Sequence, residues 1–219
     1  MQGQTATRVA KFPVTNGLRS PTAGGIQMIL GKGEELFAEG DDAEFFYQVV
    51  SGAIRSYKLL SDGRRQIDAF HLPGDIFGLE AGREHRFSAE AVGDVQLIAY
   101  RRSRLSALIE EDAAFRDRIM IATLRSLQRA QDHMMLLGRK TAQEKLATFL
   151  LDMAERLSDD DEHFDLPMQR SDIADHLGLT IETVSRTLTQ FVRSGLIRLL
   201  PAGRSISLCN KMALRGLNA

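Results

Sequence analysis

The segment Arg170 to Leu188, RSDIADHLGLTIETVSRTL, restricts the possible fold more than any other stretch of this chain. Ala174, Gly178 and Val184 stand four and six residues apart. This spacing is typical of two short helices joined by a tight turn, with glycine in the turn and a branched apolar residue beneath the second helix. An apolar underside is supplied by Ile173, Leu177, Leu179, Val184 and Leu188. The segment predicts a helix-turn-helix, which binds DNA through its second helix; an ordinary helical hairpin is the alternative.

Thr180 is a suitable N-cap for the second helix, because its hydroxyl can accept a hydrogen bond from a backbone N–H of the first turn. The first turns of such a helix reach the edges of DNA bases. They would carry Ile181, Glu182, Ser185 and Arg186. The alternative role for Glu182 is only to complement the positive end of the helix dipole.

The net charge of −1 hides an uneven distribution along the 219 residues. From Gln169 to the end there are seven basic residues (Arg170, Arg186, Arg193, Arg198, Arg204, Lys211 and Arg215) and three acidic ones (Asp172, Asp175 and Glu182), so 7 − 3 = +4. A local basic surface is what a nucleic-acid partner requires. The 43% hydrophobic content is enough for a sizeable core, most simply divided between two domains.

Cysteine content and hydropathy predict the compartment. The single cysteine, Cys209, allows no intramolecular disulfide and no cysteine cluster for zinc or iron and sulfur. The first residues contain no apolar run typical of a signal peptide, and no eighteen apolar residues follow one another. We therefore expect a cytoplasmic protein with no membrane partner.

Four regions follow from the pattern along the chain. Residues 1–25 are polar, contain Pro13 and Pro21, and predict a flexible arm. Residues 26–111 contain short apolar runs between closely spaced turns, as at Asp62-Gly63, and predict an antiparallel β-roll. Residues 112–138 have helical periodicity and residues 139–219 combine the helix-turn-helix with a hairpin, which predicts a winged helix. The fold class is therefore α+β.

The helix over 112–138 carries apolar or small residues three and four residues apart, in the order Met120, Thr123, Leu127, Ala130, Met134 and Leu137. A seam of this period can pair with a second helix. It can also pack on the β-roll of its own chain. We favour a homodimer, because the seam is narrow and lies between two predicted domains.

In the last region, Thr141 and Glu144 predict a capping box at the start of a helix that reaches Leu157. The run SDDDEHFD after it is expected to be a solvated acidic loop. Strands at 196–200 and 205–208 would form the wing. Arg204, at the wing tip, is placed to meet a DNA phosphate, although a turn arginine can also simply face water.

These pieces together resemble the cyclic-AMP receptor protein/FNR superfamily of bacterial transcription regulators, over about residues 26 to 210. The matching stretches, in the family's order, are GKGEELFAEGDDAEFFYQVVSGAIRSYKLLSDGRRQI, LPGDIFG, LGRKTAQEKLATFLLDMA and LGLTIETVSRTLTQF. The last stretch and the lack of cysteines near the N-terminus look most like the FixK branch. The resemblance implies a homodimer with a cyclic-nucleotide-binding-like β-roll (a double-stranded jelly roll), a long dimerisation helix and a winged helix-turn-helix.

The family's Glu-x-x-Ser-Arg motif matches Glu182, Ser185 and Arg186, which implies direct reading of base edges. By similarity the site would be a TTGA/TCAA palindrome. Ile181 stands where cyclic-AMP-type members carry an arginine for an additional G·C pair. The positions that usually contact phosphates match Arg170, Ser171, Thr180 and Thr183.

The β-roll departs from the family's nucleotide-binding pattern. Cyclic-nucleotide-binding members have Gly-Glu followed by Arg-Ser-Ala, whereas this chain has Gly78-Leu79-Glu80 and Arg86-Phe87-Ser88-Ala89. Phe87 separates the arginine from the serine, so we expect no phosphate cradle and place Arg86 at the surface or between domains. Oxygen-sensing members hold an iron–sulfur cluster through N-terminal cysteines, and none precedes Cys209. We therefore expect no cofactor.

The leading hypothesis is a regulator, mainly an activator, that works without an effector and recruits RNA polymerase to genes of microaerobic respiration, denitrification or nitrogen fixation. The alternative is a regulator that depends on a cyclic nucleotide or haem in its β-roll. An enzyme is not expected, because the five histidines show no metal-ligand spacing and no hydrolase motif or phosphate loop is present. We expect Cys209 to be a partly buried, inert thiol; the alternative is a redox role, because Arg204 and Lys211 are close in the sequence and positive charge lowers the pKa of a thiol. The stretch 80–86, EAGREHR, is expected to be exposed as a solvated loop or a polymerase contact.

Overall fold

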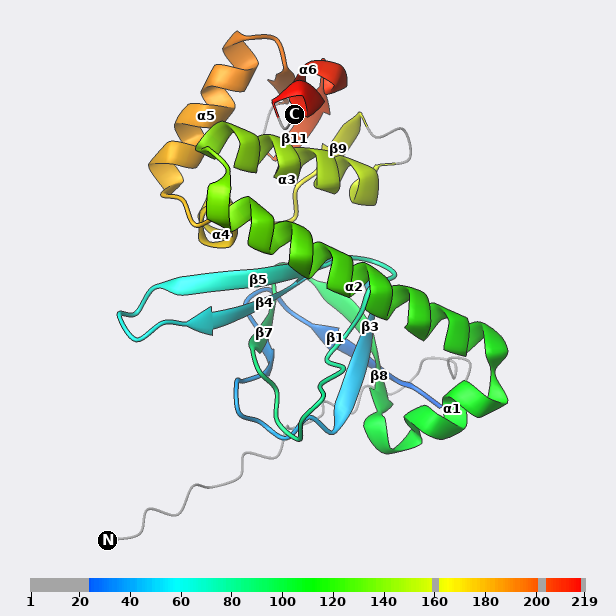
Figure 1. Ribbon diagram of the computed structural model, residues 1–219. Helices are drawn as coiled ribbons and strands as arrows, with labels where there is room; N and C mark the ends of the chain where they lie inside the picture. Colours follow the sequence, from blue (N-terminus) through cyan, green and yellow to red (C-terminus); the bar gives the residue numbers. More distant parts are fainter. Residues whose placement is uncertain (1–23, 159–161, 201–203, 218–219) are drawn as a thin grey trace, which may run out of the picture.

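The computed structural model describes residues 24–158, 162–200 and 204–217. Most of the segment 1–25, expected to be an arm, lies outside the described residues. The first domain is a β-roll of two facing antiparallel sheets (Figure 1). One sheet has the order β1-β8-β3-β6 and the other β2-β7-β4-β5. Their bounds are β1 (Ile26–Leu30), β2 (Glu35–Phe37), β3 (Phe45–Ser51), β4 (Ile54–Leu59), β5 (Arg65–His71), β6 (Ile76–Phe77), β7 (Ser88–Ala91) and β8 (Val95–Arg101).

The β-roll closes around aromatic and branched apolar side chains, because alternate residues of each strand face the space between the sheets. In β3, Tyr47 and Val49 are buried in this core, whereas Phe46 is buried in a separate cluster with Tyr100 and with Phe115 of the following helices. The β4–β5 hairpin turns at Gly63, whose φ of 84° is in the left-handed region. Glycine adopts this conformation without steric cost, so the Asp62-Gly63 turn predicted from the sequence is present.

Helical structure begins before Asp112, the residue at which periodicity predicts it. The 3-10 helix η1 (Arg102–Arg104) and the helix α1 (Leu105–Glu111) come first, and both are too short to give a clear period. Asp112 then caps α2 (Ala113–Arg139) by accepting a hydrogen bond from the backbone N–H of Phe115. The helix ends one residue after Gly138 and connects the β-roll to the second domain (Figure 1).

The second domain is a winged helix. Its elements are α3 (Ala142–Leu157), β9 (His163–Asp165), α4 (Arg170–Leu177), α5 (Ile181–Arg193), β10 (Ile197–Leu199), β11 (Ser205–Leu208) and α6 (Lys211–Gly216). The predicted capping box is present, since Thr141 Oγ accepts from Glu144 N and Glu144 accepts from Thr141 N. Hydrogen bonding to the Thr141 backbone keeps the pKa of Glu144 below its usual value. The inward side chains predicted for α3, Leu146, Phe149, Leu150 and Met153, are all buried.

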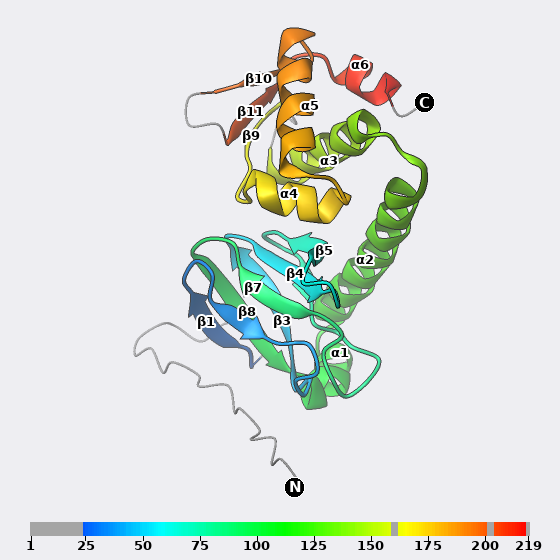
Figure 2. The same cartoon turned by 90° about the vertical axis from the view of Figure 1, so that its left-hand side faces the viewer.

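One element of this domain was not anticipated. His163, Phe164 and Asp165, expected to be part of a solvated acidic loop, form β9 and extend the wing hairpin into a three-stranded sheet of order β10-β11-β9. Phe164 is buried in the core of the domain, which explains why this segment is ordered against β11. The winged-helix domain rests on the β-roll through α4, which lies against the β4–β5 hairpin (Figure 2).

Candidate nucleic-acid interface

The helix-turn-helix is built by local capping. At the end of α4, Gly178 adopts φ 61°, ψ 43°, and Leu179 N donates to Ala174 O at 3.0 Å. A left-handed residue at this position reverses the chain within one turn. Thr180 then starts α5, because its hydroxyl accepts from Thr183 N at 3.2 Å. The turn glycine and the N-cap predicted from the sequence are therefore confirmed.

The reading helix α5 buries one face and leaves the other open. Val184, Leu188 and Phe191 are buried under it, at 0%, 3% and 1% exposure. On the opposite face of the first two turns, Ile181 is 44% exposed and Glu182 and Arg186 are also exposed. Figure 2 shows α5 at the outer side of the domain, facing the viewer. The described residues of the same chain therefore leave the candidate base-reading side chains accessible.

Candidate phosphate contacts surround this face. Arg170 Nη1 lies 3.4 Å from Ser185 Oγ, and Thr180 Oγ1 lies 3.0 Å from Thr183 Oγ1. Arg186 Nη2 is also 3.4 Å from Thr183 Oγ1. The fold thus brings five of the candidate residues into two groups of contacts, Arg170 with Ser185 and Thr183 with Thr180 and Arg186. Ser171 lies partly exposed in the first turn of α4.

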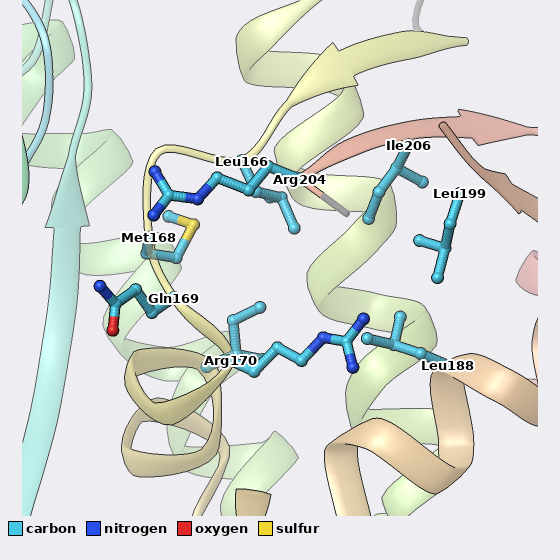
Figure 3. A pocket seen from close by; sticks show the side chains of 9 residues that line it. Leu166, Met168, Gln169, Arg170, Leu188, Leu199, Arg204 and Ile206 are labelled. Carbon is cyan, nitrogen blue, oxygen red and sulfur yellow. The ribbon is translucent and has the colours of Figure 1, made fainter. Parts of the chain in front are cut away.

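Arg204 lies at a different part of the same side. It precedes β11, and with Arg170 it borders a cavity of about 270 Å³ between the wing and the two helices (Figure 3). Leu188, Leu199 and Ile206 form part of its apolar wall. The wing turn itself, 201–203, lies outside the described residues.

Two of the three acidic residues of this basic segment are neutralised by the other domain. Asp172 lies 3.0 Å from Arg55 and 2.7 Å from Arg65, and Asp175 lies 2.8 Å from Arg65. Glu182 remains exposed on the reading face. Nothing in the local sequence indicates these pairs, because the partners are separated by 107 to 117 residues.

The β-roll interior contains stacked rings. Phe37 stacks on His85 with ring centroids 3.5 Å apart, Tyr47 on Phe77 at 5.5 Å, and His71 on Phe77 at 4.3 Å. Burial raises the pKa of the Tyr47 hydroxyl, with Asp41 and Glu44 adding to the effect.

Outside this core, Arg86 is exposed, as expected, with its guanidinium 5.8 Å from the Phe87 ring centre. Ser88 Oγ accepts from Glu39 N at 3.0 Å. Arg86 and Ser88 therefore have different neighbours and do not form one cradle.

A second cavity, of about 190 Å³, lies where the β-roll, α2 and α3 meet. Its lining includes His71, His133, Phe149 and His176. Desolvation lowers the pKa of His71 to about 4 and that of His176 to about 3. His133 stacks on His176 with centroids 4.1 Å apart. Sequence reasoning missed this group, since its members are far apart in the chain and match no spacing motif.

Two surface expectations need correction. Cys209, expected to be partly buried, is exposed, because it follows the last strand of the wing sheet and precedes the N-cap of α6. Within the stretch 80–86, His85 is only 3% exposed, because it stacks on Phe37. Arg102 also braces this loop through the carbonyls of Glu80 and Gly82.

The long helix α2 exposes an apolar stripe that is wider than the narrow seam predicted from the sequence, because Ile121, Leu124 and Met135 are exposed beside it. Of its 27 residues only Phe115, Ile119 and Leu136 are buried. All six predicted seam residues are exposed in the single chain, and further exposed apolar residues accompany them; the larger side chains are Met120, Ile121, Leu124, Leu127, Met134, Met135 and Leu137. Leu137 also lies beside the helix-turn-helix, since its Cδ2 would be 3.4 Å from a Cβ on Gly178.

A β-roll joined by a long helix to a winged helix with an open reading face defines a DNA-binding transcription regulator. Two family models match the chain, the cyclic nucleotide-binding domain over residues 28–112 and the Crp-like helix-turn-helix domain over residues 144–217. The chain belongs to the CRP/FNR family, in its FixK branch. Among the described residues, no helix combines the length and apolar composition needed to cross a membrane.

Similar proteins give the same assignment. The nitrogen fixation regulation protein FixK of Azorhizobium caulinodans is 47% identical over 199 residues, which cover 89% of this chain and 80% of that protein. FixK of Rhizobium meliloti is 44% identical over 84% of this chain and 83% of its own length. The structure of FixK2 from Bradyrhizobium japonicum superposes with a TM-score of 0.83 at 48% identity, covering 90% of this chain and 98% of that one.

Proposed function

We propose that this regulator binds a TTGA/TCAA palindrome as a homodimer without a bound effector and mainly activates transcription. The observation that carries the proposal is the exposed first half of α5, where Ile181, Glu182, Ser185 and Arg186 lie on one accessible face. Arginine can bond both acceptors of a guanine, and glutamate accepts from the amino group of cytosine. Arg170, Ser171, Thr180, Thr183 and Arg204 would hold phosphates and fix the register.

The exposed stripe of α2 supports the homodimer. A 27-residue helix with three buried side chains leaves more apolar surface in water than monomers usually expose. Pairing α2 with its copy through Met120, Thr123, Leu127, Ala130, Met134 and Leu137 would cover it. In this arrangement residues 26–111 form a sensor-like domain, 112–138 the dimer helix and 139–219 the reader.

Ring packing in the β-roll supports operation without an effector. Between its two sheets, Phe37 stacks on Tyr47 and Tyr47 stacks on Phe77, so aromatic rings fill the interior. Residues Arg86 and Ser88, which would have to cooperate around a cyclic phosphate, have separate neighbours.

The FixK relatives are nitrogen fixation regulation proteins, which supports a role at promoters of nitrogen-fixation genes. Control of genes for microaerobic respiration or denitrification, action in the cytoplasm and recruitment of RNA polymerase are further parts of the proposal. The stretch 80–86 is one candidate polymerase contact, because most of its residues are exposed.

The test is DNA binding by the purified protein with no added effector, measured by fluorescence anisotropy. We expect the wild type to prefer a TTGA/TCAA palindrome over a scrambled one. Arg186→Ala should lose that preference, at about 1–3 kcal/mol per half-site, because a bidentate base contact is removed. Arg193→Ala is the matched control: it removes an exposed arginine two turns further along the same helix, and discrimination should persist. Undiminished discrimination by Arg186→Ala would refute the assignment of the reading helix.

The match to the cyclic nucleotide-binding domain favours one second candidate, a regulator that needs a cyclic nucleotide or haem in its β-roll. Calorimetry with cyclic nucleotides and an absorbance scan of fresh protein distinguish the two. Tight binding or a Soret band would replace the effector-free proposal.

A further inference from the structure

One buried carboxylate connects the reader to the β-roll. Asp172, in the first turn of α4, is only 2% exposed and accepts from Arg55 Nη1 at 3.0 Å and from Arg65 Nη2 at 2.7 Å. Its other oxygen accepts from Gln169 N at 3.1 Å. Arg65 also donates from Nε to Asp175 at 2.9 Å. Two arginines from β4 and β5 therefore hold consecutive turns of α4.

The opposite end of α4 is held as well. His176 O accepts from His133 Nε2 of α2 at 2.8 Å and from Gln66 Nε2 of β5 at 3.3 Å. His176 Nδ1 donates to Ile67 O at 3.2 Å. The last carbonyls of a helix have no partners within it, so these donors satisfy groups that another position of α4 would leave unpaired.

These contacts favour one orientation of α4, and with it of the winged-helix domain, on the β-roll. Apolar surfaces tolerate sliding, whereas a buried carboxylate that loses its arginines carries a large desolvation penalty. Arginine donors in a planar fork add a geometric requirement that lysine lacks. Because α4 and α5 share one core, with Ile173 and Val184 both buried, an orientation fixed at α4 is also fixed for the reading face of α5.

We propose that Arg55, Arg65 and Gln66 form a clamp that presets the orientation of the reader on the β-roll, with Asp172 as a positioning residue for DNA reading. This inference rests on the proposed function. The clamp orients the winged-helix domain through protein side chains alone and needs no small molecule. It also neutralises Asp172 and Asp175, two acidic groups that would otherwise repel DNA phosphates.

The test compares Arg65→Met, and the pair Arg55→Met with Arg65→Met, against Arg64→Met. Arg64 is the matched control because it is on the same hairpin, its side chain is 77% exposed and its ion pair is with Asp62, not with α4. Spin labels on Cys209 and on Asp94→Cys report the distance between the domains. Labelled subunits are diluted with excess unlabelled protein, so that only distances within one subunit are read.

We expect one narrow distance distribution for the wild type and Arg64→Met, and a broad one for the double variant. If the competent orientation falls to about a tenth of the population in each subunit, affinity for the palindrome falls about a hundredfold, because both readers of the dimer must be correctly oriented. The salt dependence of binding should not change, because the phosphate contacts themselves remain. The charge exchange Arg65→Asp with Asp175→Arg should give a narrower distance distribution than Arg65→Asp alone.

A narrow distribution and full affinity in the double variant would overturn the clamp. Distances are measured without DNA, so they judge the clamp even if the wild type does not recognise the palindrome, a result that would count against the proposed function instead. Should the double variant fail to fold, Arg65→Met alone, at a side chain 23% exposed, gives the same comparison.

Discussion

At the scale of single residues, the reading face combines two kinds of group with different consequences. Glu182 and Arg186 carry hydrogen-bonding groups that match base edges, whereas Ile181 offers only an apolar surface at 44% exposure. An apolar side chain cannot select a G·C pair through hydrogen bonds. In the proposed mode of binding, Ile181 would therefore leave the base pair that it faces unselected, while Glu182 and Arg186 would select theirs.

Ile181→Arg should consequently add a preference for an additional G·C pair in each half-site. The guanidinium can bond both guanine acceptors, which is worth about 1–3 kcal/mol of discrimination per half-site. Competition binding against oligonucleotides that vary the base pair next to the TTGA core would measure it. Ile181→Met is the control, since it keeps an apolar side chain at this position and should leave the base preference unchanged. An Ile181→Arg variant with unchanged base preference would contradict the assigned position of Ile181.

Residue by residue, the sequence predicts what is determined locally. Thr180, Gly178 and the Thr141–Glu144 box act over three or four positions, and all three are confirmed. Asp172 looks like an ordinary capping residue in the sequence, and its arginines lie more than a hundred positions away. Long-range ion pairs follow from the docking of two domains, which no local spacing encodes.

At the scale of elements, the turn between α4 and α5 depends on one glycine. Gly178→Ala should destabilise the protein by about 1–2 kcal/mol, because a Cβ is unfavourable in the left-handed conformation and would lie 3.4 Å from Leu137. Denaturant unfolding measures the change. Gly138→Ala is the contrast, since Gly138 lies within α2 and a Cβ there meets nothing within 4 Å. That substitution should stabilise the helix by about 0.5–1 kcal/mol, so equal effects of the two variants would argue against this explanation.

The helix α2 makes the clearest prediction about assembly. Leu127→Glu places a charge in the middle of the exposed stripe, where Leu127 is 56% exposed in the single chain. We expect sedimentation equilibrium to show monomers at concentrations where the wild type is dimeric, and affinity for the palindrome to fall because one half-site is lost. Gln128→Glu, on an exposed neighbouring position away from the predicted seam, should leave the dimer intact. If the Leu127→Glu variant is still dimeric, the dimer interface is not at this stripe of α2.

The length of an element decides whether the periodicity of the sequence predicts it. Long segments such as α2 and α3 have several turns over which a pattern can accumulate, and they were anticipated to within a few residues. The elements η1, α1 and β9 have three to seven residues each and were not. The strand β9 forms because it pairs with β11 and because Phe164 is buried in the core of the domain. Both are tertiary contacts, which a local pattern does not encode.

At the scale of the whole molecule, two histidines connect domain docking to pH. His71 lies beside the cavity between the domains and His176 in α4 against β5, and burial lowers their pKa values from 6.5 to about 4 and about 3. Between pH 6.5 and these lowered values, both rings therefore stay neutral in the native state, whereas they bind protons in the unfolded chain. Their stabilising contribution is complete above pH 6.5 and is lost as the pH falls from 6.5 towards 4 for His71 and towards 3 for His176.

Thermal unfolding between pH 7.5 and pH 4 should therefore show a midpoint that falls with decreasing pH. Each histidine contributes at most about 1.4 kcal/mol per pH unit in its window, less where water reaches the ring. His71→Gln should reduce this slope, because it removes one of the two groups that bind protons on unfolding. His163→Gln is the control, since His163 is exposed in β9 and does not line the cavity at the junction between the domains. If His71→Gln and His163→Gln reduce the slope equally, acid would be acting through carboxylates distributed over the molecule and not through the junction between the domains.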